Sequence, residues 1–165
     1  MKNKRISTRT YKFLIKDENN VYAKLENLFR VIVLLRRILI EDRRRVQASS
    51  DRIMGTNEQV SRFIDIKDET PLNLIPYDTA LAIIKDISAY HNKNKHVPNI
   101  GEFYNIKVPF YCSVSYRYDE MNVPGIGVIK IKRDKPIPRD RSVIVSNIYK
   151  KGKSWYADLV TKKKE

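Results

Sequence analysis

The stretch that decides the fold is Ile106-Lys-Val-Pro-Phe-Tyr-Cys-Ser-Val-Ser-Tyr-Arg-Tyr118. Apolar or aromatic residues occupy every second position of this stretch, which is the pattern of a β-strand with one buried face. Pro109 has no backbone N–H to donate, so we expect the strand at an edge of its sheet or at a bulge. Upstream of residue 105 the apolar residues recur at helical spacing instead. The change of period therefore separates a helical part of the chain from a part rich in strands.

Three more strands are predicted downstream, at residues 128–132, 142–149 and 154–160. Pro124 and Gly125 supply the two central residues of a turn ahead of the first of them, and Lys150-Lys-Gly-Lys153 makes the last hairpin. Before the helical part, residues 10–16 alternate in the same way. Antiparallel strands with short links close most easily as a small barrel. The first strand can join that barrel only if residues 20–100 form a helical insert beside it.

The insert contains two or three predicted helices. Asn20 can cap the first, whose apolar stripe runs from Val21 to Leu39 and whose end we place near Val46. Asn57 is the expected cap of a second, short helix, and Pro76 suits the first turn of a third. The buried side of the third helix is expected to hold Ala80, Ile83, Ile84, Ile87 and Tyr90.

These elements predict an α+β fold class: a small antiparallel, OB-like β-barrel with a helical insert after its first strand. We expect the barrel to comprise residues 1–16 and 101–165, and the helical lobe to comprise residues 17–100. A chain of 165 residues with 42% hydrophobic residues is long enough to bury the core of such a barrel and its insert.

The charge balance points to a polyanionic partner. The chain has 33 basic and 19 acidic residues, a formal net charge of +14, and nucleic acid is the partner that such an excess favours over an acidic protein or a membrane surface. The longest apolar run, Val31 to Leu35, is far too short to span a membrane. Met1 to Ile6 lead into no apolar stretch, so no signal peptide is expected, and the single Cys112 indicates a reducing compartment. We therefore expect a cytoplasmic nucleic-acid-binding protein with no membrane association.

Arginines on the first predicted helix are candidate phosphate contacts. Arg30, Arg37 and Arg44 recur at intervals of seven, so they align along one side of the helix. The full predicted set on and after this helix is Arg30, Arg36, Arg37, Arg43, Arg44, Arg45 and Arg52. The alternative is an ordinary solvated face, with Glu41 and Asp42 neutralising part of it.

A second set of candidates lies on the barrel strands and the loops that join them. It comprises Lys130, Lys132, Arg133, Arg139, Arg141, Lys150, Lys151, Lys153 and Trp155. Basic barrel faces of this kind track nucleic-acid backbones, although lysines on edge strands also serve to block aggregation. Trp155 and Tyr156 point to opposite faces of a regular strand, so at most one of them can stack on a base and the other is expected in the core.

No catalytic, metal or cofactor site is predicted. His91 and His96 lack cysteine or clustered acidic partners, and Ser113 and Ser115 have no neighbouring base to activate them. Cys112 lies on the apolar side of its predicted strand and is interpreted as a small core residue.

The segment from Val123 to Ala157 resembles the part of the TnpB (OrfB-type) transposon proteins that precedes their nuclease domain. The matching positions are Pro124, Gly127, Lys130, Lys132, Ile137-Pro138 and Trp155-Tyr156. A weaker likeness extends over most of the chain, with Pro98 and Phe103 in place and Tyr104 where that family has a lysine. TnpB-type proteins are compact RNA-guided nucleases related to type V CRISPR effectors. In them a first strand belongs to a wedge barrel, a helical recognition lobe interrupts it, and the remaining barrel strands lead into a RuvC nuclease.

The resemblance implies that the two lobes hold the scaffold of a guide RNA and inspect a short DNA motif. Only Thr161 to Glu165 follow Val160, with neither the Gly-Ile-Asp-like strand of a RuvC site nor a CxxC pair, so we expect a nuclease-lacking protein that is not an enzyme by itself. Structured RNA and DNA are both open as ligands, and a separate RuvC-containing chain is a further candidate partner. Two alternatives remain: a basic module that docks on a host protein complex, and one half of a split nuclease.

Overall fold

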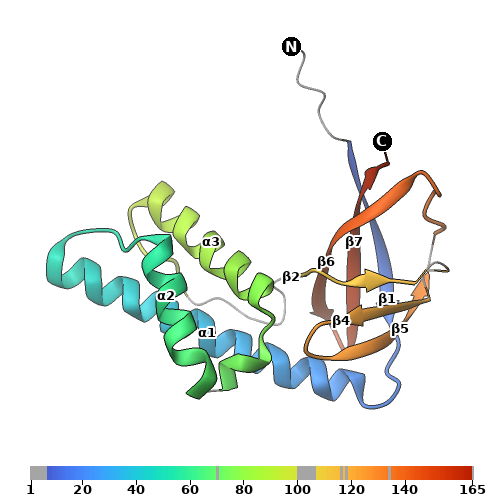
Figure 1. Ribbon diagram of the computed structural model, residues 1–165, viewed down its shortest axis with the longest axis horizontal. Helices are drawn as coiled ribbons and strands as arrows, with labels where there is room; N and C mark the ends of the chain where they lie inside the picture. Colours follow the sequence, from blue (N-terminus) through green and yellow to red (C-terminus); the bar gives the residue numbers. More distant parts are fainter. Residues whose placement is uncertain are drawn as a thin grey trace, which may run out of the picture. The chain divides into compact units, whose positions relative to one another are not determined.

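The computed structural model describes residues 7–69, 71–99, 107–115, 117, 119–133 and 135–164. Within them the fold is mixed α+β, with three α-helices and a seven-stranded antiparallel sheet (Figure 1). The chain divides into two compact units. We call Met1–Lys24 with Tyr104–Glu165 the sheet unit, and Leu25–Phe103 the helical unit.

The sheet unit is built from seven strands in the order β2-β6-β7-β1-β5-β4-β3. Their bounds are Thr8–Ile15 (β1), Val108–Phe110 (β2), Ser113–Val114 (β3), Glu120–Val123 (β4), Gly127–Arg133 (β5), Arg141–Lys151 (β6) and Ser154–Lys163 (β7). The first strand lies between β7 and β5, with Phe13 opposite Ala157 on one side and Arg133 on the other. The prediction that the first strand pairs with the C-terminal strands is therefore confirmed.

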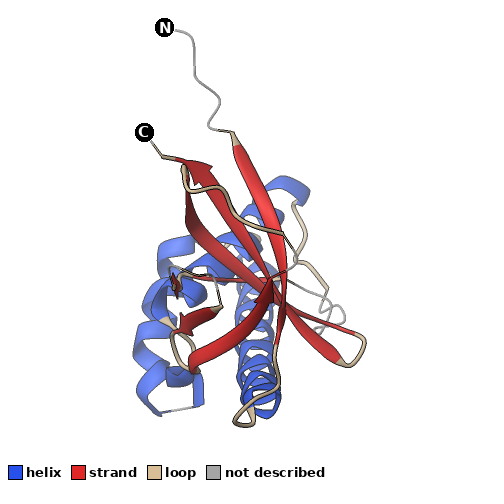
Figure 2. Cartoon of the chain, turned by 90° about the vertical axis from the view of Figure 1, so that its right-hand side faces the viewer, coloured by secondary structure: helices blue, strands red, loops and turns tan. Residues whose placement is uncertain are grey.

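Connectivity shows that this sheet is curled. Strands β2 and β3 lie at opposite ends of the strand order, yet only Tyr111 and Cys112 separate them in sequence. Three Cα-to-Cα steps reach about 10 Å at most, whereas the edges of a flat seven-stranded sheet would be about 29 Å apart. The sheet must therefore bend round until its two edges approach each other, and Figure 2 shows its strands crossing at steep angles.

The long strand predicted over residues 106–118 is wrong in one respect, because its described part forms two short strands. Strand β2 pairs with β6, whereas β3 pairs with β4, and the chain crosses from one partner to the other at Tyr111 and Cys112. The strand pairing is therefore interrupted there, while the alternation of buried residues continues. Pro109 lies opposite Asn147 in the edge strand β2, which confirms its predicted edge position. Ile106, Tyr116 and Tyr118 lie outside the described residues.

Both predicted turns are confirmed. Between β4 and β5 the Ile126 N–H donates to the Val123 carbonyl oxygen at 3.0 Å, and Gly125 has a φ of 86° that a residue with a Cβ rarely adopts. Between β6 and β7, Gly152 has a φ of 63° in a loop of two residues. These turns set the register of the two hairpins.

One face of the sheet forms the apolar core of its unit. The buried side chains include Phe13, Ile15, Phe110, Ile129, Ile131, Ile148, Trp155 and Leu159. They alternate with outward-facing residues on every long strand, so the opposite face carries the polar side chains.

The helical unit contains most of α1 (Val21–Ser50), together with α2 (Thr56–Ile66) and α3 (Tyr77–Asn94). Short 3₁₀ helices at Lys67–Glu69 and Pro71–Leu74 connect the last two. Its buried side chains include Phe29 and Leu35 of α1, Phe63 of α2, and Ile83 and Ile84 of α3. No helix in the described part of the chain is long and apolar enough to cross a membrane.

Three details of the helices differ from the prediction. Helix α1 continues past Val46 to Ser50, whose hydroxyl donates to the Val46 carbonyl at 2.6 Å. Gly55 rather than Asn57 is the cap of α2, and its N–H donates to the Glu58 carboxylate at 3.2 Å. On α3, Tyr90 is exposed and His91 is buried, because the buried stripe of that helix continues from Ile84 and Ile87 to position 91.

Candidate nucleic-acid interface

The positive charge of the chain is concentrated in one of its two units. The sheet unit contains 21 basic and 8 acidic residues, a formal net charge of +13, and the helical unit contains 12 basic and 11 acidic residues, a net charge of +1. The candidate cations predicted from the sequence are shared between the two units. The division of charge instead makes the sheet unit the main candidate for contact with a polyanion.

Arg43 was predicted as a surface cation, and this prediction is wrong. Its side chain is fully buried, its Nε donates to Gln59 Oε1 at 2.6 Å, and its Nη1 lies 3.1 Å from His91 Nδ1. Leu35 and Leu39 belong to the buried stripe of α1. Position 43 lies one further turn along the same stripe, so the Arg43 side chain points into the core. The same spacing in the sequence would have revealed its burial.

Other arginines of the helical unit are held by acidic side chains. The buried carboxylate of Asp42 pairs with Arg45 and, at 3.3 Å, with Arg62. Arg52 pairs with Glu58 at 2.7 Å. Arg45 and Arg52 are both exposed, and a phosphate would have to compete with these carboxylates for their guanidinium groups.

Four predicted arginines remain on α1. Arg36 is half-buried, and burial lowers its pKa while Asp86 opposes the shift. Arg30, Arg37 and Arg44 are exposed, and no acidic side chain of the described residues forms an ion pair with them. Arg44 also donates to Asn99 Oδ1 at 3.4 Å. Of the predicted arginines on α1, these three are exposed and form no ion pair within the described part of the chain.

In the sheet unit, most of the predicted cations are exposed. Lys130, Lys132, Arg139, Lys151 and Lys153 reach solvent, and among them Lys130 lies 3.6 Å from Glu18. Lys150 is half-buried. The Arg133 side chain lies outside the described part of the structure.

Arg141 is a structural residue rather than a surface cation, so its predicted role is wrong. It is buried at the start of β6, where its Nε donates to Thr161 Oγ1 at 2.8 Å and its Nη2 donates to the Ser7 carbonyl oxygen at 2.9 Å. The guanidinium therefore joins the residue that precedes β1 to β7, and its donors are used inside the fold.

Trp155 was predicted to contact nucleic acid, but its side chain is 1% exposed. It shares the core face of β7 with Ala157 and Leu159, and Tyr156 points to the opposite face as expected. On that face Tyr156 stacks on Tyr149 of β6, with ring centroids 5.8 Å apart and an interplanar angle of 22°. Of the aromatic pair, Tyr156 is thus the outward member.

Two lysines flank the tyrosine pair. Lys12 Nζ lies 4.4 Å from the centroid of the Tyr156 ring, and Lys107 Nζ lies 4.8 Å from that of Tyr149. Asp158 accepts from Lys107 Nζ at 2.6 Å and from the Tyr149 hydroxyl at 3.0 Å. Burial, with the hydrogen bond to Asp158, raises the pKa of Tyr149 to about 12, so this phenol stays neutral and serves to position its neighbours.

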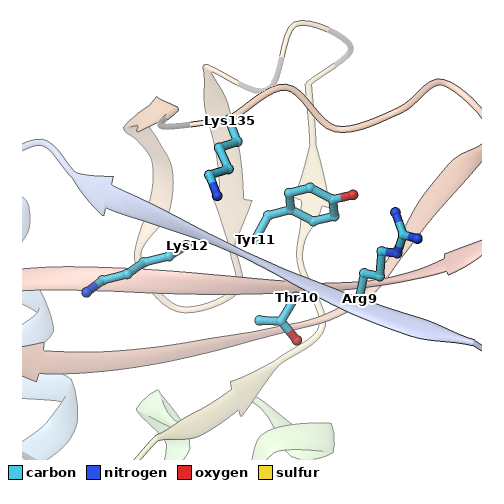
Figure 3. Close-up of a pocket in the computed structure, with 5 residues that line it drawn as sticks. All are labelled: Arg9, Thr10, Tyr11, Lys12 and Lys135. Atoms are coloured by element: carbon cyan, nitrogen blue, oxygen red, sulfur yellow. The ribbon is translucent and has the colours of Figure 1, made fainter.

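An open pocket of about 510 Å³ lies beside β1 in the same unit (Figure 3). The described residues that line it are Arg9, Thr10, Tyr11, Lys12 and Lys135. None of its three cations was among the predicted contacts, because they stand singly in the sequence and Lys135 is distant from Arg9 and Lys12. The signal available was the alternation of Arg9 with Tyr11 on one face of the first strand.

Groups suited to metal binding or nucleophilic chemistry are not gathered anywhere in the described residues. No three His, Cys, Asp or Glu side chains among them lie close enough together to hold a metal ion. Burial raises the pKa of Cys112 to about 11, so its thiol stays protonated near neutral pH. The side chains gathered on the described surface of the sheet unit are cations and tyrosines. In comparisons with known proteins, no family model and no curated protein matches this chain.

Proposed function

We propose that this protein binds a nucleic-acid backbone, chiefly through its sheet unit. The observation that carries the proposal is the division of charge, with +13 on the sheet unit and +1 on the helical unit. An excess of this size on a unit of 86 residues attracts a polyanion over long distances and is screened by salt. Exposed lysines on the strands and hairpins, such as Lys132, Lys151 and Lys153, would meet the phosphates.

We also propose that the sheet unit is a wedge-like, OB-like barrel of the TnpB kind, and that the helical unit corresponds to the recognition lobe. The support is the set of matching positions between Val123 and Ala157, together with an order of elements in which helices interrupt a first strand and later strands. On this proposal the ligand is structured RNA, DNA or both, and a RuvC-containing chain is a candidate partner.

Binding without cleavage is the activity proposed for this chain. A two-metal nuclease needs clustered carboxylates to hold its ions, and the described residues contain no cluster of that kind. Incubation of the pure protein with single- and double-stranded DNA and RNA in magnesium or manganese should give no products. Cleavage that co-purifies with the protein through successive columns would contradict this part of the proposal.

The binding itself can be tested by fluorescence anisotropy with labelled RNA and DNA at several salt concentrations. If the protein neutralises about 6–10 phosphates, its affinity should fall by about 10³–10⁵ between 50 and 200 mM salt. Absence of binding to any nucleic acid at low salt would overturn the proposal. A salt-tolerant complex with an acidic protein would then favour the docking module.

A further inference from the structure

The pocket beside β1 has the chemistry of an anion site. Three of its five described lining residues are cations, Thr10 and Tyr11 add hydroxyl donors, and none of the five is acidic. In Figure 3 the side chains of Arg9 and Tyr11 extend from the side of β1 that faces Lys135, and Thr10 points the other way. Arg9 and Lys135 thus line the same pocket although they come from separate parts of the chain.

The backbone of β1 is also available along this pocket. Strand β1 pairs with β7 from Thr8 to Leu14, but it pairs with β5 only from Phe13 to Ile15. Over Thr8 to Lys12, therefore, the described residues provide a strand partner on one side of β1 alone. The unpaired edge of a strand presents N–H groups that need an acceptor, and phosphate oxygens accept hydrogen bonds from backbone N–H groups.

The size of the pocket and its tyrosine favour a nucleotide over a bare phosphate. A volume of about 510 Å³ lies in the range of small-molecule sites, about 300–1,000 Å³. Tyr11 is half-buried, so one part of its ring packs against the protein while the other borders the pocket. Bases in a duplex are stacked on one another, whereas unpaired bases are free to stack on an aromatic side chain.

We propose that this pocket binds one nucleotide of an unpaired strand, with its phosphate held by Arg9 and Lys135 and its base stacked on Tyr11. The inference rests on the proposed function and adds a ligand class to it: a single-stranded segment or a strand end, in RNA or in DNA.

The test compares R9Q/K135Q with the control R30Q/R37Q, which removes the same charge from exposed positions of α1. The ligands are labelled 12-nucleotide oligo(dT), oligo(rU) and a blunt-ended DNA hairpin whose strands are joined by a hexaethylene glycol linker, so that the hairpin contains no unpaired nucleotide. In R9Q/K135Q the affinity for the single strands should fall about 10- to 30-fold at 0.1 M salt, and the salt slope should become shallower by about 0.7 units, since the two cations hold one phosphate and each phosphate contact on a single strand contributes about 0.7. The hairpin should lose less than the single strands, and the control should lose little on either. Oligo(dT) and oligo(rU) show which sugar the pocket prefers.

Tyr11 has its own test. In Y11L, which keeps an apolar side chain, the affinity for single strands should fall about 5- to 150-fold, while hairpin binding stays unchanged. The wild-type protein supplies a measurement that does not depend on the folding of a variant: an oligonucleotide containing 5-iodouridine should photo-crosslink to the peptide that contains Tyr11. Normal single-strand binding by R9Q/K135Q, equal losses on single strands and hairpin, or a crosslink elsewhere would overturn the pocket assignment and leave the proposed function standing. Failure of the wild-type protein to bind any of the three ligands would overturn both.

Discussion

Arg43 places a guanidinium inside the helical unit, where Gln59 and His91 are its hydrogen-bond partners among the described residues. Gln59 joins it to the backbone, because Gln59 Oε1 accepts from Arg43 Nε while Gln59 Nε2 donates to the Leu39 carbonyl oxygen at 2.9 Å. Burial lowers the pKa of Arg43, and its Nη2 finds no acceptor among the described residues. This cluster of Arg43, Gln59 and His91 stabilises the fold only while all three side chains are present. Removal of any one of them leaves a buried polar group of a neighbour without its hydrogen-bond partner.

Replacing Arg43 by Ala should therefore affect stability and leave binding alone. We expect R43A to lower the free energy of unfolding by about 1–3 kcal/mol, because Gln59 and His91 lose their partner. The matched change R44A removes an exposed arginine of the same helix and should cost about 0.5 kcal/mol or less. Chemical denaturation followed by circular dichroism measures both. Equal stabilities for R43A and R44A would show that Arg43 is not a core residue.

His91 gives the helical unit a dependence on pH. Burial, and then the charge of Arg43, lower the pKa of His91 below its ordinary value of 6.5. The unfolded chain therefore binds the proton more readily than the folded protein, so stability should fall as the pH drops below about 6.5 and should level off above that value. Thermal melts between pH 5 and pH 8 should show this decline in the wild type and a weaker one in H91Q. A wild-type melting temperature that rises towards acid pH would contradict the assignment.

At the scale of elements, strand faces and helix stripes explain which predictions succeeded. The β6–β7 and β4–β5 hairpins could be predicted because the turn residues stand at the required positions. The inward position of Trp155 could also have been predicted, since Trp155, Ala157 and Leu159 are all apolar on their face while the other face carries Asp158. The break between β2 and β3 could not be predicted from the sequence. The alternation of buried residues continues through both strands, and what changes is the neighbouring strand, which is β6 for β2 and β4 for β3.

Arg141 connects three segments of the sheet unit, and its removal should loosen the start of β1. In R141Q the Ser7 and Thr161 carbonyl oxygens lose their donor, so we expect a loss of about 1–3 kcal/mol in the free energy of unfolding. The exposed neighbour provides the control, and R139Q should be near neutral. Faster amide hydrogen exchange at Thr8 to Thr10 in R141Q alone would locate the effect. Identical exchange in both variants would rule out this role.

At the scale of the whole molecule, net charge alone did not reveal where a ligand would bind. The value of +14 belongs to the chain, and its division became visible only when the contacts between distant segments defined the two units. Residues 1–24 join residues 104–165 through the pairing of β1, which brings the lysines of both chain ends into one unit. For the same reason the pocket of Arg9, Tyr11 and Lys135 could not be assembled from the sequence.

Whether nucleic acid binds chiefly to the sheet unit can be measured by the salt dependence of binding in two matched triple variants. K132Q/K151Q/K153Q removes three exposed cations from the sheet unit, and R30Q/R37Q/R44Q removes three from the helical unit. We predict that the plot of log affinity against log salt becomes shallower by up to about three units in the sheet variant and changes by less than about one unit in the helical variant. Both variants should fold normally, because exposed cations contribute little to stability. A larger change in the helical variant, or an unchanged slope in the sheet variant, would contradict the account.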